Sequence, residues 1–277
     1  MKNTLLNQLQ ALELPTDAAD ALCAFGQAVV KQNEVMNLTA ITEPAAVAKL
    51  HLADSVTVLK CADLRGKTLI DVGCGAGFPG VPLKIACPEV NLTLLDSLGK
   101  RMTWLETILP QLGVDATCIT ARAEEAVATR REQYDFATSR AVARLNILLE
   151  LTAPFVKVGG AVLALKGAAA EEELQEAKSA IAKLGLKLEQ VHHFPIDGAD
   201  HAVIVLRKVK PTPAAYPRRY AKIKQAPLYS PCPGATTAPG HFCGINWRLS
   251  GRYDRCGWVT TTTVIARSAA TWQKINV

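Results

Sequence analysis

The stretch LIDVGCGAGFPG, residues 69–80, decides the fold of this 277-residue chain. An apolar run reaches an acid, Asp71, and four glycines follow at positions 73, 75, 77 and 80. This pattern is typical of a β-strand that turns sharply into a helix, because glycine allows positive φ angles and a close approach of a ligand to the backbone. The helix behind the turn presents unpaired N–H groups. We therefore expect a nucleotide-like ligand at this turn.

The residues beyond the glycines favour the same interpretation. Strand 68–72 is followed by a helical stretch at 81–86 and a second strand at 91–96, which ends in Asp96. An acid about 20 residues beyond such a turn holds ribose hydroxyls. The GxGxxG spacing alone is weak, because the same glycines also suit a tight connection with nothing bound.

Helical patterns occupy the chain ahead of the turn. Residues 3–60 are predicted to be helical, with Thr16 or Asp17 as the cap of a stretch that reaches about Met36. A second stretch begins at Pro44, which suits a first helical turn.

Strands and helices alternate beyond residue 66. Further strands are predicted at 116–120, 134–139, 161–166, 186–196 and 201–209, and the charged segment 171–185 is predicted to be one helix. The Asp-Gly turn between the last two strands forces them antiparallel. We expect an α/β fold with a mostly parallel seven-stranded sheet that ends in an antiparallel hairpin, helices on both faces and an N-terminal helical region.

Charge is distributed unevenly along the chain. Residues 1–206 contain 19 Lys and Arg against 24 Asp and Glu, whereas residues 207–224 contain seven basic residues and no acid. This basic strip suits a polyanionic partner, although a solvated surface without a partner is the alternative.

The sequence divides into four predicted regions. They are 1–60 (helical), 61–210 (Rossmann-like core), 211–228 (basic strip) and 229–277 (atypical tail, disordered or non-native).

The composition also argues against several classes of protein. The eight cysteines form no CxxC pair, so we expect neither a disulfide framework nor a metal site. The first 14 residues lack the apolar core of a signal peptide, and no stretch is typical of a membrane span. We expect a cytoplasmic monomer that has no membrane partner.

A series of motifs resembles one family over residues 20–228. The motifs are MNLT (36–39), HLADS (51–55), the glycine turn, LLDSLGKR (94–101), SRA (139–141), LKG (165–167) and YPRRYAKIKQAPL (216–228). They resemble the bacterial small-subunit rRNA guanine-N7 methyltransferase family, also called the glucose-inhibited division protein B family. The resemblance implies a Rossmann-like class I fold, S-adenosyl-L-methionine as the cofactor, and 16S rRNA or the small ribosomal subunit as the partner. It also implies methyl transfer to guanine N7 in the decoding-region loop.

The resemblance assigns cofactor contacts residue by residue. They are Gly73, Phe78, Ala123, Glu124 and Arg140; the turn itself adds Asp71, Gly75 and Gly77, and the end of the second strand adds Asp96. Each has an ordinary alternative: Asp71 could be a helix N-terminal acid, Phe78 a core residue, Asp96 a solvated acid and Glu124 the opening of a helix.

Arg140 is the residue that we expect to take part in catalysis. Methyltransferases that act on exocyclic amines commonly carry an Asn/Asp-Pro-Pro-aromatic motif after the fourth strand, where this chain has Ser139, Arg140 and Ala141. Guanine N7 carries a lone pair and no proton, so in-line transfer to it requires no general base. Arg140 is then a guanine, phosphate or cofactor contact, and a structural ion pair is the alternative.

Eight basic residues are candidates for a phosphate-binding rim. They are Lys100, Arg101, Arg144, Lys166, Arg218, Arg219, Lys222 and Lys224.

His51 and Asp54 lie three apart in HLADS and could either pack onto the cofactor cleft or form a buried hydrogen-bonded pair. The sequence assigns no role to His192, His193 and His201.

Two other functions remain to be weighed. A nicotinamide-dependent dehydrogenase could use the same glycines and Asp96, but it normally needs a second nucleotide-binding half. A non-enzymatic RNA-binding protein could rely on the basic strip alone, but it would not need the cofactor residues.

Overall fold

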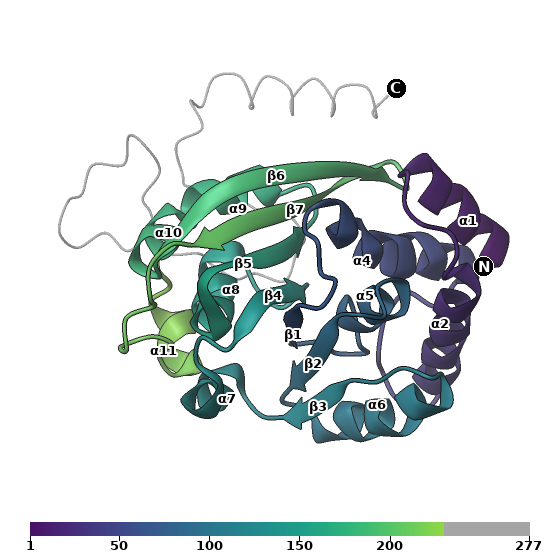
Figure 1. Cartoon of the computed structure of the whole chain (residues 1–277), viewed down its shortest axis with the longest axis horizontal. Helices are drawn as coiled ribbons and strands as arrows, with labels where there is room; N and C mark the ends of the chain where they lie inside the picture. The colour runs from purple at the N-terminus through teal and green to yellow at the C-terminus, as the bar shows by residue number, and fades with distance from the viewer. Residues whose placement is uncertain (230–277) are drawn as a thin grey trace, which may run out of the picture. The chain divides into compact units, whose positions relative to one another are not determined.

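A seven-stranded sheet forms the centre of the part of the chain that is described, residues 1–229 of a computed structural model (Figure 1). Its strands are β1 (Thr68–Val72), β2 (Asn91–Asp96), β3 (Thr117–Thr120), β4 (Tyr134–Arg140), β5 (Val156–Lys166), β6 (Leu186–Ile196) and β7 (Ala199–Lys208). The strand order is β3-β2-β1-β4-β5-β7-β6. Strands β1 to β5 pair in parallel, and β7 is antiparallel to both β5 and β6. The expected sheet and its terminal hairpin are confirmed. The expectation for the tail falls, except at Tyr229, outside the described residues.

Helices precede the sheet and connect its strands. The N-terminal helices are α1 (Lys2–Ala11) and α2 (Ala19–Asn33), and a continuous helical run follows as α3 (Pro44–Ala46), η1 (Val47–Ala53), α4 (Asp54–Val56) and η2 (Thr57–Lys60). The connecting and C-terminal helices are α5 (Gly80–Ala86), α6 (Gly99–Gln111), α7 (Ala123–Arg130), α8 (Leu145–Thr152), η3 (Ala153–Phe155), α9 (Ala170–Glu176), α10 (Lys178–Lys183) and α11 (Tyr220–Gln225).

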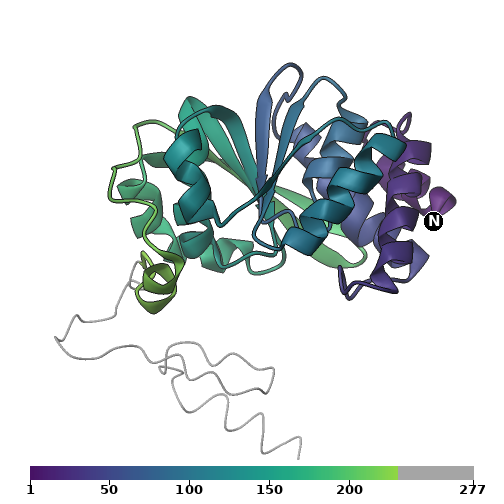
Figure 2. The same cartoon turned by 90° about the horizontal axis from the view of Figure 1, so that it is seen from below.

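The helices cover both faces of the sheet, as Figure 2 shows. Successive strand residues point to opposite faces, and in β5 the side chains of Leu163 and Val162 enter two different apolar cores. The first core also contains Leu5 and Phe25 of the N-terminal helices. The N-terminal helices therefore complete one side of the sheet and share its core.

The hairpin turn follows directly from its two residues. Asp197 and Gly198 both have positive φ angles, 52° and 76°. Two consecutive residues of this kind form a type I′ turn, whose twist matches that of antiparallel strands. The Asp-Gly prediction is confirmed, although β7 begins at Ala199, two residues before the expected start.

Three local expectations were wrong. The N-cap of α2 is Ala18, without a side-chain cap, because the Ala19 N–H instead bonds the carbonyl of Thr16 in a backbone turn. The segment 171–185 forms two helices that meet at Ala177. Strand β5 begins at Val156 rather than 161, because a register shift against β4 allows its first residues to pair.

Candidate active site

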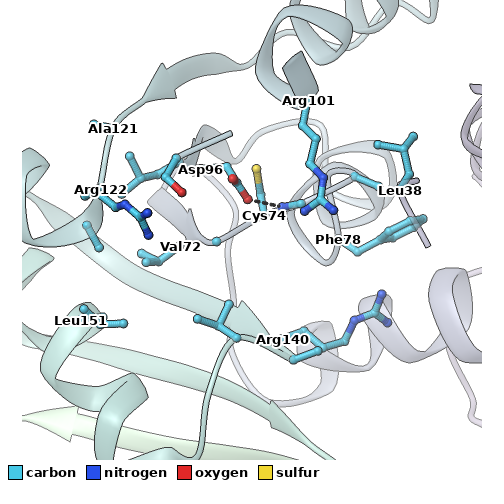
Figure 3. A pocket seen from close by; sticks show the side chains of 18 of the residues that line it. Leu38, Val72, Cys74, Phe78, Asp96, Arg101, Ala121, Arg122, Arg140 and Leu151 are labelled. Atoms are coloured by element: carbon cyan, nitrogen blue, oxygen red, sulfur yellow. Dashed lines mark hydrogen bonds between the residues drawn. The ribbon is translucent and has the colours of Figure 1, made fainter. Parts of the chain in front are cut away.

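A cavity of about 460 Å³ lies at the carboxyl ends of strands β1 to β4 (Figure 3). The strand order reverses between β1 and β4, and such a switch point is where open α/β sheets bind ligands. The lining contains residues from six of the seven motifs named above, all except LKG. Of the expected cofactor contacts, it includes Gly73, Gly75, Phe78, Asp96, Ala123, Glu124 and Arg140.

The glycine turn forms the floor of this cavity. Gly73 has a φ of 74°, and a Cβ added there would lie 2.5 Å from Cγ2 of Val142, which follows β4. Gly75 has a φ of 56°, and its Cβ would meet only Nη1 of Arg101 at 3.8 Å. The first glycine therefore allows two loops to approach each other, and the second leaves open space above the backbone.

Asp71 supports the turn from behind and is absent from the cavity lining. Its carboxylate is fully buried, and Oδ2 accepts a hydrogen bond of 2.8 Å from the Gly80 N–H. Oδ1 has no partner within residues 1–229. Burial raises the pKa of Asp71 to about 7. Gly77, with a φ of 95°, also lies outside the lining, where an added Cβ would meet Cγ2 of Val81 at 2.7 Å.

Two carboxylates mark the opposite wall of the cavity. Asp96 accepts hydrogen bonds of 2.9 Å from the N–H groups of Gly75 and Leu98, one on each oxygen. Figure 3 shows the first of these bonds beside Cys74. A carboxylate has about four lone-pair positions, so Asp96 retains acceptor capacity for a ligand. Glu124 accepts an N–H bond of 3.2 Å from Tyr220, the first residue of α11, which also lines the cavity.

Arg140 is held at the other end of the cavity by several partners. Its Nη1 donates to the carbonyl of Leu50 and to Oδ2 of Asp54, both at 2.8 Å. Its Nη2 lies 3.0 Å from Nδ1 of His51, and its guanidinium lies 5.2 Å from the centre of the Phe78 ring. Only 14% of its side chain is exposed. The ion pair that was considered as an alternative role is present, and Arg140 lines the cavity as well.

Of the HLADS residues that reach Arg140, His51 lies in the π-helical segment Val47–Ala53, a feature that often occurs at functional sites, and Asp54 begins α4 directly after it. The His51 ring stacks on Phe78 with 4.7 Å between the ring centres, and its Nε2 lies 2.8 Å from Oγ1 of Thr39. Burial, with the nearby charge of Arg140, lowers the pKa of His51 to about 4. His51 is therefore neutral near pH 7 and lines the cavity.

His201, which received no role from the sequence, completes this cluster from β7. Its Nδ1 lies 2.8 Å from Oδ1 of Asp54. Burial raises the pKa of Asp54, but the hydrogen bond from His201 and the charge of Arg140 outweigh it and lower the pKa overall. No sequence signal connects His201 to residue 54, because the contact spans 147 positions of the chain.

Three of the eight expected phosphate contacts are engaged in contacts within the protein. Lys166 has only 7% of its side chain exposed and pairs with Glu173 at 2.8 Å. Arg144 pairs with Glu172 and Glu176. Arg218 pairs at 2.6 Å with a Glu150 carboxylate that is fully buried. Each of these three side chains neutralises an acid of the fold, so the expectation that they contact phosphate stays a prediction in which they would have to serve both partners.

The other five basic residues lie on the surface or at the cavity. Lys100, Arg219, Lys222 and Lys224 are exposed, and none of them forms an ion pair with another residue in the range 1–229. Arg101 lines the cavity, as does Arg122, which the sequence did not single out. Both side chains point toward the cavity in Figure 3.

Cys74 is the cysteine of the cavity lining. It is 2% exposed, and burial raises the pKa of its thiol well above the usual value. The thiolate form needed for a nucleophile is therefore disfavoured.

Across residues 1–229, no cluster of three or more His, Cys, Asp or Glu side chains is arranged to hold a metal ion, and no helix there is long and apolar enough to cross a bilayer.

Comparison with known proteins identifies the family. The family described as "GidB: rRNA small subunit methyltransferase G" matches residues 18–202. The "Ribosomal RNA small subunit methyltransferase G" of Alkaliphilus metalliredigens is 43% identical over 213 residues, which cover 75% of this chain and 89% of that protein. Its namesake in Desulfitobacterium hafniense is 42% identical over 229 residues, which cover 81% and 95%. Among solved structures, M. jannaschii TYW2 in complex with AdoMet is 14% identical with a TM-score of 0.47, covering 57% of this chain and 76% of that one. The sequence matches establish that this chain belongs to the rRNA small subunit methyltransferase G family.

Proposed function

We propose that this protein transfers a methyl group from S-adenosyl-L-methionine to N7 of a guanine in small-subunit rRNA. The observation that carries the proposal is the cavity between β1 and β4. It has a glycine-lined cradle at one end and a fixed arginine at the other, and its lining carboxylates, Asp96 and Glu124, come from β2 and from the segment after β3 rather than from the end with the arginine.

The cradle fits the cofactor. The space above Gly75 would admit a ligand against the backbone, and the remaining lone pairs of Asp96 suit the two ribose hydroxyls. Ala123 and Glu124 follow β3 on the same side and would contact the adenine. When bound, S-adenosylmethionine supplies a methyl group on a positively charged sulfur. Phe78 and Arg140 stand at the far end, where the methyl acceptor would enter.

The acid-base chemistry of that far end favours a nitrogen without a proton. Nδ1 of His51 faces Arg140, and the pKa of about 4 makes this ring a weak base. An arginine is a donor and not a base near pH 7. Methylation of an exocyclic amine requires the loss of a proton, whereas methylation of guanine N7 does not. The residues at this end therefore need only position the base.

The buried thiol argues against a second type of methyl transfer. Methylation of a pyrimidine at carbon 5 requires a cysteine nucleophile, and the raised pKa of Cys74 disfavours the thiolate. The dehydrogenase and the purely RNA-binding alternatives are not favoured, because the chain belongs to a methyltransferase family.

Basic residues on both sides of the cavity mouth support an RNA substrate. Lys100, Arg101 and Arg122 lie near the carboxyl ends of β2 and β3, and Arg219 and Lys222 belong to the segment that begins α11. Phosphate contacts of this kind position a nucleic acid without reading its sequence. We expect them to place the rRNA backbone so that one base enters the cavity.

The direct test is chemical mapping of the methylated base. Small ribosomal subunits from a strain that lacks this gene are incubated with the purified protein and labelled S-adenosylmethionine, and the rRNA is then treated with borohydride and aniline, which cleave at N7-methylguanine. We expect label and cleavage at one guanine. Label without such cleavage, or label on a pyrimidine, would contradict the proposal.

A matched control separates the cofactor cradle from the basic residues. Gly73→Asp should abolish cofactor binding in calorimetry, whereas Lys222→Glu should leave that binding intact and weaken the association with RNA. Equal cofactor affinity in wild type and Gly73→Asp would remove the glycine turn from the proposed site.

A further inference from the structure

Hydrogen bonding fixes the protonation of the His51 ring. Arginine can only donate, so the contact of 3.0 Å between Nη2 of Arg140 and Nδ1 of His51 makes Nδ1 the acceptor. A neutral imidazole has one N–H group, which must then be on Nε2. Nε2 lies 2.8 Å from Oγ1 of Thr39 and therefore donates to it.

The hydroxyl of Thr39 consequently keeps its own proton for another partner. Its oxygen accepts one hydrogen bond from His51 and a second, of 3.0 Å, from the Ile41 N–H. A hydroxyl has two acceptor lone pairs and one donor, so only the donor remains. Among the hydrogen bonds recorded for residues 1–229, no acceptor receives this proton. Thr39 lines the cavity, as does His51 beside it.

We propose that the Thr39 hydroxyl donates a hydrogen bond to O6 of the target guanine and thereby makes the site specific for guanine. This inference rests on the proposed function. Guanine presents two acceptors on one edge, N7 and O6, whereas adenine presents N7 and an amino group that donates. With N7 used by the methyl group, O6 is the acceptor that distinguishes the two purines.

The position of Thr39 favours the base over the cofactor. Two carboxylates suit the nucleoside of the cofactor: Asp96 ends β2, and Glu124 follows β3. Thr39 instead belongs to the N-terminal segment and is connected through His51 to Arg140, which ends β4. This end of the cavity presents donors, because Arg140 has further N–H groups beyond those that hold Leu50, Asp54 and His51. An adenine amino group would face donors there and would lose its hydrogen bonds.

The test combines a change in the protein with a change in the base. Small subunits are reconstituted with rRNA that carries either guanine or 2-aminopurine, which lacks O6, at the mapped position. For wild type we expect kcat/KM to be roughly 3- to 10-fold lower on 2-aminopurine, apart from any change in the reactivity of N7. Thr39→Val should lower kcat/KM on guanine by a similar factor and should cause no further loss on 2-aminopurine. The four values of kcat/KM, for wild type and Thr39→Val on each of the two bases, form a cycle in which the intrinsic difference in N7 reactivity cancels.

Matched variants give the remaining readouts. Thr39→Ser keeps the hydroxyl and should retain the preference for guanine, and Thr42→Val, an exposed residue of the same loop outside the cavity lining, should behave as wild type. Cofactor affinity by calorimetry should not change in any of these proteins. Equal losses on the two bases in Thr39→Val, or a fall in cofactor affinity, would overturn the proposal.

Two outcomes need no stable valine variant. Equal wild-type rates on guanine and 2-aminopurine, once divided by the rates at which a simple alkylating agent methylates N7 of the two free nucleosides, would overturn the role of Thr39 while the guanine-N7 activity stands. Failure of wild type to methylate guanine at N7 would instead overturn the proposed function, and the inference would fall with it.

Discussion

The ion pair between Arg218 and Glu150 should determine whether the C-terminal helix stays docked. Glu150 is fully buried in α8, and its two oxygens accept three bonds from Arg218: from Nη2 at 2.6 Å, from Nε at 2.8 Å and from the backbone N–H at 2.9 Å. Removal of one partner from a buried pair costs roughly 3–5 kcal/mol, because it leaves an uncompensated charge. The backbone N–H bond survives in Arg218→Ala. We therefore expect a loss of about 3 kcal/mol, at the lower end of that range.

The assay for Arg218→Ala must distinguish global unfolding from undocking of the C-terminal segment, residues 216–228, alone. Urea denaturation reports the free energy of unfolding, and hydrogen exchange over residues 216–228 reports the local opening. The double variant Glu150→Gln, Arg218→Ala removes the buried charge and should recover about 2 kcal/mol of the loss, because hydrogen bonds without a full charge are worth about 1 kcal/mol each. The exposed neighbour provides the control, since Arg219→Ala should change stability by less than about 0.5 kcal/mol.

The same variant should also weaken cofactor binding. Tyr220 lies two residues beyond Arg218, lines the cavity and donates its N–H to Glu124. An undocked α11 would remove this contact and open the cavity at the end proposed for adenine. A loss of less than about 1 kcal/mol in both stability measurements, or no recovery in the double variant, would refute the reasoning about Glu150.

Four further outcomes are expected. Gly73→Ala should abolish cofactor binding in calorimetry, because its Cβ would lie 2.5 Å from Val142 at a φ of 74°, and retained affinity would contradict the tight approach of the two loops. Folding raises the pKa of Asp71 from 3.8 to about 7, so the free energy of unfolding of wild type should fall relative to that of Asp71→Asn as the pH rises from about 4 to about 7. If urea denaturation gives the same pH dependence for both proteins, the pKa of Asp71 is not raised by burial. Lys222→Glu should lower RNA affinity and reduce its salt dependence in filter binding, and identical slopes would exclude a phosphate contact. Asp54→Asn should lower kcat at least about tenfold, with cofactor affinity nearly unchanged, as single-turnover methylation would show.

Local pattern was sufficient for most of the fold. Strand β1 was predicted with the observed bounds because apolar residues run up to the first glycine, and the final hairpin followed from Asp197 and Gly198. The break between α9 and α10 was missed, since the charged segment keeps a helical period through Ala177. The Ala18 cap was missed because a backbone turn replaced the side-chain cap, and no residue preference announces such a turn.

The site was predictable to the extent that it follows strand ends. Asp96 ends a parallel strand, and Gly73 and Glu124 follow two others, and the carboxyl ends of these strands meet at one edge of the sheet. The partners of the basic residues were not predictable, because Arg144 and Arg218 find their acids on helices that are distant in sequence. His201 illustrates the same limit, since only the folded sheet brings β7 next to the HLADS segment.

The charge balance around Arg140 fits the proposed reaction, which would move a positive charge from the sulfur of the cofactor to the base. Guanine would become positively charged at N7 while the sulfur loses its charge, so an unpaired guanidinium closer to the base than to the sulfur would oppose the transfer. Two unit charges about 5 Å apart repel by roughly 3 kcal/mol at an effective dielectric constant of 20. Asp54 removes most of this repulsion by pairing with Arg140 at 2.8 Å, and His201 holds the other oxygen of the same carboxylate. Arg140 can therefore act as a hydrogen-bond donor to the base without acting as a bare cation. In this proposal, Asp54 of the N-terminal helical run neutralises the arginine at the end of β4, and the neutral form of His51 suits the same site.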